Sequence, residues 1–249
     1  IKGGGIRLYK SSAGDATLII SGGEIGGVWA GEPNTAIGTS GNGGGISVEG
    51  GSCTVTLKDN AKITNNKAKY GGGVYASGGS LVMTSSSIEK CQATQEGGGI
   101  FAKGGSVELN SCIIKGNKGT LAGGGICARA NGSTPARVTI NGGVIGGTSV
   151  SEANTTTGSS GKGGGIFVSG MNSAVTLLGT ANVIGNTATL YGGGVFVDTG
   201  SVLNMQGSAI VTPSTGSDAN APLKNDVYLM DGCKIKLSET LSGAVPVAR

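Results

Sequence analysis

A run of three glycines recurs seven times along the chain and limits the folds that the sequence can adopt. Each run is followed by an apolar residue, a variable residue and a second apolar or small residue, as in Ile46-Ser47-Val48. Val227-Tyr228-Leu229 is an eighth copy that lacks the glycines. This alternation with a period of two predicts a strand with one buried face, repeated along a solenoid. The triplets begin at Gly3, Gly43, Gly71, Gly97, Gly123, Gly163 and Gly192, at intervals of 40, 28, 26, 26, 40 and 29 residues.

Two further apolar segments follow each of these strands. The second segment lies at residues such as 55–57, 107–109 and 175–177, and the third has the form Ile-x-x-Asn or a close variant. Three short strands with glycine and asparagine between them describe one coil, because these two residues adopt the left-handed conformations that sharp corners need. The third segments run from Ile63 to Asn66, Ile88 to Cys91, Ile114 to Asn117 and Val183 to Asn186.

The sequence therefore predicts an all-β fold, a single-stranded right-handed parallel β-helix of about eight coils with three short strands per coil. A spacing of about 4.8 Å per coil gives a body about 35–40 Å long. We expect Asn66, Asn117 and Asn186 to form an internal amide ladder that Cys91 interrupts. We also expect one domain over residues 1–249, long corner loops at about 26–42, 146–162 and 211–223, and a chain that is part of a longer protein.

The composition removes several classes of function. Lys and Arg exceed Asp and Glu by only four, and no basic segment is interleaved with aromatic residues, so no nucleic-acid partner is expected. No apolar run is long enough to insert into a membrane as a helix. Histidine, the commonest metal ligand and general base, is absent. The five cysteines form no CxxC pair and occupy no matching positions on neighbouring coils, so we expect free thiols, no metal and no cofactor.

One column of outward-facing positions gathers aromatic side chains. The position four residues after the first glycine of the triplets holds every phenylalanine of the chain. Such a row of rings can bind a glycan or an extended partner chain, or the rings can stack on one another or lie under a loop. The long corner loops lead into the same strands and can wall the column, or they can be tolerated insertions. The candidate ligand-binding residues are Tyr75, Phe101, Phe167, Phe196 and Tyr228 in the column, Lys103 and Arg129 beside it, and Trp29 in the first loop.

The Gly-Gly-Gly-Ile-x-Val and Ile-x-x-Asn signatures resemble the repeats of bacterial surface-exposed parallel β-helix proteins. Chlamydial polymorphic outer-membrane proteins carry a related pattern, with Ala as the third residue and Phe before the asparagine motif, and spirochaete surface proteins have similar glycine-rich coils. The resemblance covers about residues 3–237. It implies a non-catalytic adhesin or passenger module, secreted or held at the bacterial cell surface in association with the outer membrane. Its implied partners are a host or environmental glycan or protein, and neighbouring domains of the same chain.

Two other functions remain open. Polysaccharide lyases and glycoside hydrolases of the pectin-lyase-like fold act on the first-strand face, but their chemistry needs clustered acidic residues. Glu49 and Asp198 share a column yet lie five coils apart, about 24 Å on the strand spacing, so we expect no catalysis. A structural stalk is the other possibility. It predicts an aromatic column that is covered or used for lateral packing, whereas a glycan-binding strip predicts an exposed one.

Overall fold

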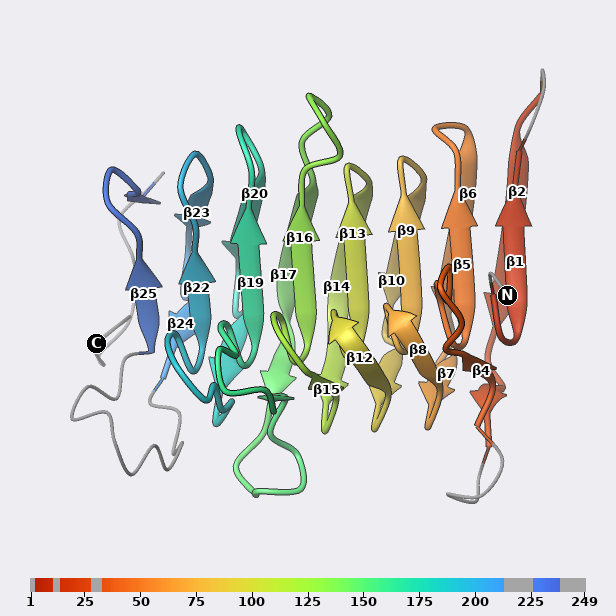
Figure 1. Cartoon of the computed structure of the whole chain (residues 1–249), viewed down its shortest axis with the longest axis horizontal. Helices are drawn as coiled ribbons and strands as arrows, with labels where there is room; N and C mark the ends of the chain where they lie inside the picture. Colours follow the sequence, from red (N-terminus) through yellow and green to blue (C-terminus); the bar gives the residue numbers. More distant parts are fainter. Residues whose placement is uncertain (1–2, 11–13, 28–32, 213–225, 238–249) are drawn as a thin grey trace.

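The computed structural model describes residues 3–10, 14–27, 33–212 and 226–237, which form a parallel β-helix (Figure 1). Eight coils lie side by side in chain order and pair through parallel strands. The predicted fold class is confirmed. The described residues contain no helix, and so no helical segment that meets the length and hydropathy needed to cross a membrane.

Sheet A contains the strands that follow the glycine triplets, one from each coil. All the pairs are in register, so Ile100 lies between Val74 and Ile126 and the apolar positions form continuous columns. The strands are β1 (Ile6–Tyr9), β5 (Ile46–Glu49), β9 (Val74–Ser77), β13 (Ile100–Lys103), β16 (Ile126–Arg129), β19 (Ile166–Ser169), β22 (Val195–Val197) and β25 (Val227–Leu229).

Sheet B contains both the second and the third predicted segments. In two central coils these segments fuse into one ten-residue strand, and elsewhere a turn separates them. The second-segment strands are β2 (Ala16–Ser21), β6 (Cys53–Lys58), β10 (Ser80–Thr84), β14 (Ser106–Lys115), β17 (Arg137–Gly146), β20 (Ala174–Leu178), β23 (Val202–Met205) and β26 (Ile235–Leu237). The separate third-segment strands are β3 (Glu24–Gly26), β7 (Lys62–Thr64), β11 (Ser87–Glu89), β21 (Asn182–Ile184) and β24 (Ile210–Val211).

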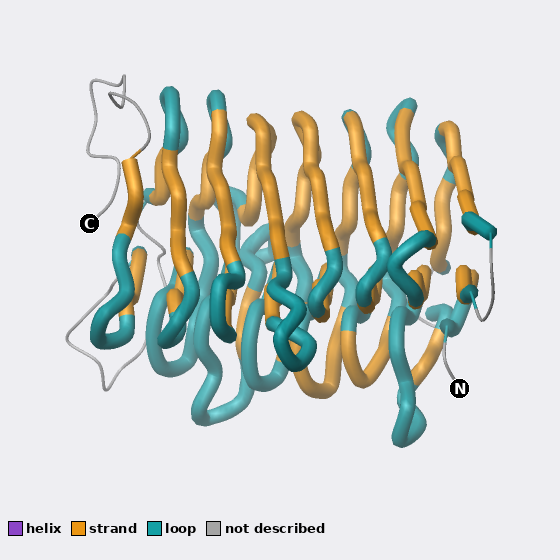
Figure 2. The backbone as a smooth tube through the Cα atoms, turned by 90° about the horizontal axis from the view of Figure 1, so that it is seen from above, coloured by secondary structure: helices purple, strands orange, loops and turns teal. Residues whose placement is uncertain are grey.

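Sheet C was not predicted and follows the third segment in five coils. Its strands are β4 (Thr35–Ala36), β8 (Lys67–Tyr70), β12 (Gln92–Glu96), β15 (Lys118–Gly119) and β18 (Thr155–Thr156). Figure 2 shows the stack from above, with the strands of successive coils aligned and joined by turns. In these five coils the chain therefore passes through a short, largely polar strand before it enters the next glycine triplet.

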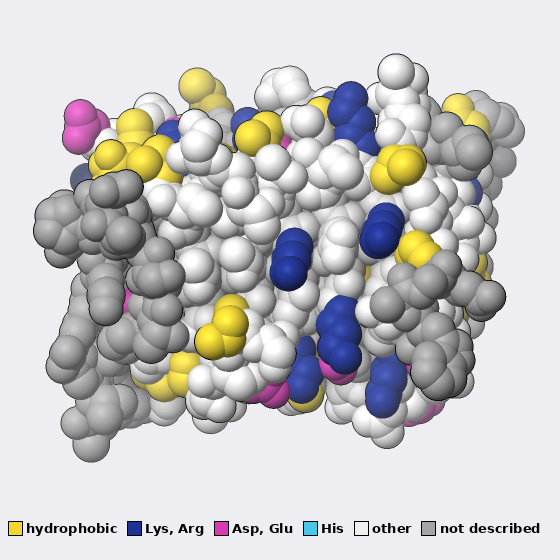
Figure 3. Space-filling model, turned by 60° about the horizontal axis from the view of Figure 1, so that its bottom comes forward, with side chains coloured by type: hydrophobic (Ala, Val, Ile, Leu, Met, Phe, Trp, Pro, Cys, Tyr) yellow, Lys and Arg dark blue, Asp and Glu magenta, His cyan; other side chains and the backbone are white. Residues whose placement is uncertain are grey.

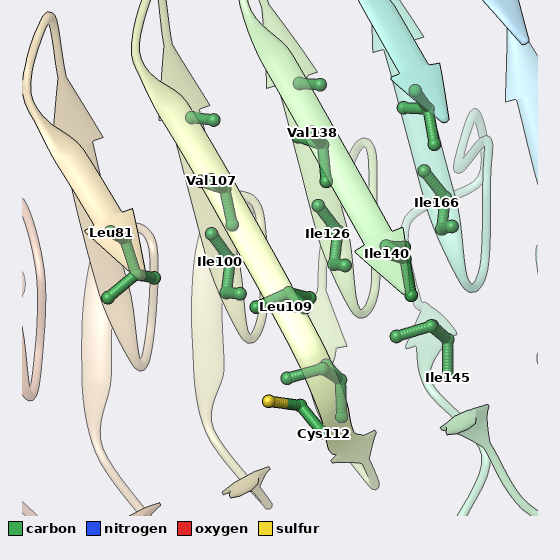
Figure 4. Close-up of a cluster of buried hydrophobic side chains, with 14 of the residues drawn as sticks. Leu81, Ile100, Val107, Leu109, Cys112, Ile126, Val138, Ile140, Ile145 and Ile166 are labelled. Carbon is green, nitrogen blue, oxygen red and sulfur yellow. The ribbon is translucent and has the colours of Figure 1, made fainter. Parts of the chain in front are cut away.

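The interior is filled by apolar side chains that repeat from coil to coil. Figure 4 shows Ile100 and Ile126 of sheet A near Val107, Leu109 and other side chains of sheet B, and these residues are fully or almost fully buried. The first and last coils contribute side chains that are only partly buried, among them Ile6 and Val227. Burial is thus deepest in the middle of the solenoid.

The three glycines of each triplet are required for different reasons. The first has a positive φ, as at Gly97 (φ +67°), which glycine adopts without strain. A Cβ on the second, Gly98, would lie 2.3 Å from the carbonyl oxygen of Gly124 on the next coil. A Cβ on the third, Gly99, would lie 3.1 Å from the Asn117 amide. The triplet therefore allows the backbones of adjacent coils and the internal asparagines to approach closely.

The internal amide ladder is longer than predicted. Asn34 and Asn154, which lie in the two long corner loops, join Asn66, Asn117 and Asn186. Neighbouring amides donate from Nδ2 to Oδ1 over 2.9 Å between Asn34 and Asn66 and between Asn117 and Asn154, and over 3.0 Å between Asn154 and Asn186. At the predicted interruption, Asn66 Nδ2 lies 4.0 Å from Cys91 Sγ. All five cysteines are free, as expected.

Candidate functional site

The predicted aromatic column exists on the outer face of sheet A. Its positions are in register through Tyr75, Phe101, Cys127, Phe167, Phe196 and Tyr228. The rings stack with centroids 5.6 Å apart for Tyr75 and Phe101, 5.4 Å for Phe167 and Phe196, and 5.2 Å for Phe196 and Tyr228. Cys127 divides the column into two aromatic stacks. Coil-to-coil stacking, one of the two interpretations of the sequence pattern, is what the structure contains.

A second column of side chains covers the first. It consists of the residue immediately before each glycine triplet, and β-bridges stack these residues as Asn42, Tyr70, Glu96, Ala122, Lys162 and Tyr191. Three of the covering residues reach the ring of the following coil. The Tyr70 ring lies 5.4 Å from that of Phe101, Lys162 Nζ lies 5.0 Å from the Phe196 centroid, and the Tyr191 ring lies 4.5 Å from that of Tyr228.

The covering column corrects the interpretation of the aromatic column as a continuous binding strip. Phe167 and Phe196 are 4% and 1% exposed, so their rings are not available to a ligand in this structure. They are buried because the chain before each triplet folds over sheet A. Tyr228 is partly buried, against Tyr191. Trp29 and the loop at about 211–223, except Val211 and Thr212, lie outside the described residues.

A pocket on this face brings four predicted residues together. Tyr75, Phe101, Lys103 and Arg129 line a cavity of about 610 Å³, which we call the sheet A pocket. The first corner loop contributes Thr39, Ser40 and Asn42 to its wall, and Ser77 and Tyr70 complete the uncharged part of the lining. The predicted residues Phe167, Phe196 and Tyr228 do not line it.

Two glutamates line the same pocket, and both are held by arginines. Glu96 accepts two hydrogen bonds from Arg129, from Nη2 to Oε1 over 2.8 Å and from Nε to Oε2 over 3.0 Å. Glu49 Oε1 accepts bonds from Arg7 Nε over 3.2 Å and from Ser47 over 3.0 Å. The Arg129 guanidinium also lies 5.2 Å from the Phe167 centroid. Arg129 is therefore fixed by its neighbours on both sides.

Lys103 and Tyr75 give the pocket its remaining polar chemistry. Lys103 makes no ion pair with any described residue, so its ammonium group is available to a ligand. Burial raises the pKa of Tyr75, and the negative charge of Glu49 raises it further. The Tyr75 hydroxyl therefore stays protonated well above neutral pH and can donate a hydrogen bond.

Sequence reasoning missed Glu96 and Tyr70 because it followed the positions after each triplet. Both residues stand immediately before a glycine triplet, and a comparison of that position across the coils could have located them. The occupants of that position share neither size nor charge along the stack, so no periodic property marks them as one column. The described residues contain no cluster of three or more acidic, cysteine or histidine side chains that would hold a metal ion. With its carboxylates engaged by arginines, the pocket is equipped to bind polar groups.

Comparisons with protein-family models, with curated proteins and with solved structures find no match to this chain.

Proposed function

We propose that the chain is a non-catalytic adhesion or binding module at a bacterial surface, and that the sheet A pocket holds part of a glycan. The convergence of Tyr75, Phe101, Lys103 and Arg129 in one cavity carries the proposal. Its volume of about 610 Å³ is within the range of small-molecule and cofactor sites. The surface location and the origin of the ligand rest on the resemblance of the repeats to bacterial surface proteins.

The lining suits a sugar better than an apolar ligand. Hydroxyl and amide groups of Thr39, Ser40, Asn42 and Ser77 can bond sugar hydroxyls, and Tyr70 and Phe101 supply aromatic surface. Lys103 adds an unpaired cation that favours an acidic or strongly polar substituent. An extended polypeptide is a less favoured occupant because Phe167 and Phe196, further along sheet A, are buried and offer it no aromatic surface.

Binding without turnover fits the state of the two glutamates. Both oxygens of Glu96 are bonded to Arg129, which leaves this carboxylate poorly placed to exchange a proton with a substrate. A polysaccharide lyase or glycoside hydrolase stays the alternative, since two carboxylates do line one pocket. Incubation of any bound polysaccharide with the protein, followed by analysis of chain length, separates binding from cleavage.

A structural stalk is the second candidate, and one observation favours it. The aromatic column is covered, which is the arrangement expected if the rings serve only to stabilise the solenoid. A stalk needs no free cation in the sheet A pocket. The response of glycan binding to changes at Lys103 therefore distinguishes the two functions.

A glycan array probed with the wild-type chain and with Lys103→Ala tests the proposal. We expect binding to at least one glycan class, weakened about tenfold in Lys103→Ala through loss of a charged contact. Lys236→Ala, an exposed lysine on β26, is the matched control and should bind as the wild type does. Absence of binding by every form would contradict the proposal and favour the stalk. Substitution of Phe101, Phe167 and Phe196 is unsuitable, because these side chains are buried.

A further inference from the structure

A second pocket lies on sheet C, away from the aromatic column, and we propose that it binds an acidic polysaccharide. The cavity has a volume of about 550 Å³ and shares no lining residue with the sheet A pocket. We call it the lysine pocket because Lys90 and Lys118 line it. The proposal concerns a separate site and does not depend on glycan binding at the sheet A pocket.

Three consecutive coils build the floor of the lysine pocket. Gln92 of β12, Lys118 of β15 and Thr155 of β18 are paired in register, so their side chains succeed one another about every 4.8 Å along the solenoid. Lys90 joins them from the turn before β12. The floor is thus a regular row of hydrogen-bond donors on a rigid sheet.

The second long corner loop forms a wall of the pocket through Val150, Ser151 and Ala153. Glu152, in the same loop, anchors it to sheet B and the turn that follows. The Glu152 carboxylate lies 3.2 Å from Lys115 Nζ, and its carbonyl accepts a 2.8 Å hydrogen bond from the Gly116 amide. From the sequence, this loop could wall the aromatic column or be a tolerated insertion. In the structure its residues 150–153 wall a pocket on sheet C.

The charge of the lysine pocket is unbalanced. None of its lining residues is acidic, and neither Lys90 nor Lys118 forms an ion pair within the part of the chain that is described. Both lysines are exposed, in contrast to Lys115, which is paired with Glu152. Lys67 precedes Gln92 in the same column, two coils and about 10 Å before Lys118, and so extends the row by one coil. Figure 3 shows basic side chains on this underside of the solenoid, surrounded mainly by uncharged surface.

An acidic polysaccharide fits this arrangement better than a nucleic acid. Both offer repeated negative charges to a row of lysines. The lysine pocket has no aromatic lining on which bases could stack, whereas Asn65, Gln92 and Thr155 offer amide and hydroxyl groups for sugar hydroxyls. The ligand class is therefore a carboxylated or sulfated sugar chain that lies along the solenoid axis.

Binding to immobilised polygalacturonate and dextran sulfate, with neutral dextran as the reference, tests this inference and separates carboxylate from sulfate recognition. We expect the wild type to bind at least one acidic polymer, and affinity to fall about tenfold or more in Lys90→Gln/Lys118→Gln. The matched control is Lys234→Gln/Lys236→Gln, which removes the same charge from exposed positions in the last coil and should keep affinity within about twofold. The loss in Lys90→Gln/Lys118→Gln should exceed any loss in Lys103→Ala, which separates this binding from that of the sheet A pocket.

Three results would overturn the inference. The first is no binding of either acidic polymer by the wild type. The second is an equal loss in the two double variants, which would mean that net charge alone attracts the polymer. The third is equal or stronger binding of single-stranded DNA in the same assay. Lys90 and Lys118 are exposed, so their substitution should leave the melting temperature unchanged. Equal melting temperatures in all variants establish that the differences in affinity do not come from unfolding.

Discussion

At the scale of single residues, the internal asparagines satisfy one another across the coils. Asn154 Nδ2 donates to Asn186 Oδ1 over 3.0 Å and to the Ile114 carbonyl over 2.7 Å, so both amide hydrogens are used. Asn117 repeats this arrangement with Asn154 and Ile88. Buried amides with every group paired stabilise one register of stacking, because a shift of register would leave them unpaired.

Replacement of Cys91 by Asn tests whether an amide at the interrupted position of the ladder stabilises the fold. Asn66 Nδ2 now faces Cys91 Sγ at 4.0 Å, and Asn117 Oδ1 accepts only the Cys91 backbone amide at 2.9 Å. Cys91→Asn should complete the row and raise the free energy of unfolding by about 1 kcal/mol, measured by denaturant unfolding. Cys112→Asn is the control: this buried position is outside the ladder, so it should destabilise. A less stable Cys91→Asn protein would contradict the prediction.

The buried thiols also predict how stability depends on pH. Burial raises the pKa of Cys91 from 9.0 to about 12 and raises those of Cys112 and Cys127 as well. The folded state therefore keeps these thiols protonated, whereas the unfolded state ionises them near pH 9. The stability is fully present below pH 9 and should fall as the pH rises from 9 toward 12. Urea unfolding at pH 8 and pH 10.5 measures this change, and replacement of Cys91 by Ala should make the dependence shallower; equal slopes in the two proteins would contradict it.

At the scale of the element, the glycine triplet sets how closely successive coils pack. Gly98→Ala would place a Cβ 2.3 Å from the Gly124 carbonyl oxygen and 2.4 Å from the backbone carbonyl carbon of Lys118. Backbone atoms on two sides cannot both move away without breaking the sheets. We expect a loss of about 3 kcal/mol or more in the free energy of unfolding. Gly51→Ala, where the nearest atom to the new Cβ is 3.8 Å away, should change the stability by less than about 0.5 kcal/mol. Similar effects of the two substitutions would show that the triplet does not act by close packing.

The sequence predicted the strands that carry buried apolar side chains and missed those that do not. Alternation marked sheets A and B, as in β6, where every second residue is buried. Sheet C strands bury little more than one small residue each, such as Ala68 in β8 and Ala93 in β12, so they have no hydrophobic period. The sequence failed to predict Asn34 and Asn154 as members of the amide ladder for another reason. Each lies nine residues after its third-segment isoleucine, Ile25 or Ile145, whereas Asn66 lies three after Ile63.

In the candidate site, too, the residues that repeat from coil to coil could be predicted and those that vary could not. The column of Tyr75, Phe101 and Phe167 was predictable because its position after each glycine triplet is constant. Its covering was not, since Glu96, Ala122 and Lys162 occupy equivalent positions but share neither size nor charge. These three residues make different kinds of contact with sheet A. Contacts that differ from coil to coil leave no repeating pattern in the sequence.

At the scale of the whole molecule, stability should vary along the solenoid axis. Each coil contacts only its neighbours, so the free energy that holds a coil depends on how many sides are paired. β13 has partners on both sides, and its Ile100 is fully buried. Among the described strands β1 pairs only with β5, and its Ile6 and Leu8 are half-buried.

Hydrogen exchange should therefore be slowest in the central coils. We expect the amides of β13 and β16 to exchange at least about tenfold more slowly than those of β1, because the end coil can open without disturbing the apolar columns of the middle. Exchange measured by mass spectrometry on peptides from the native chain checks this directly. Gly98→Ala, which strikes the central contact, should remove the difference by accelerating β13. Equal protection of β1 and β13 in the wild type would instead mean that the coils open only together, and that coupling between neighbours exceeds the loss of one paired side.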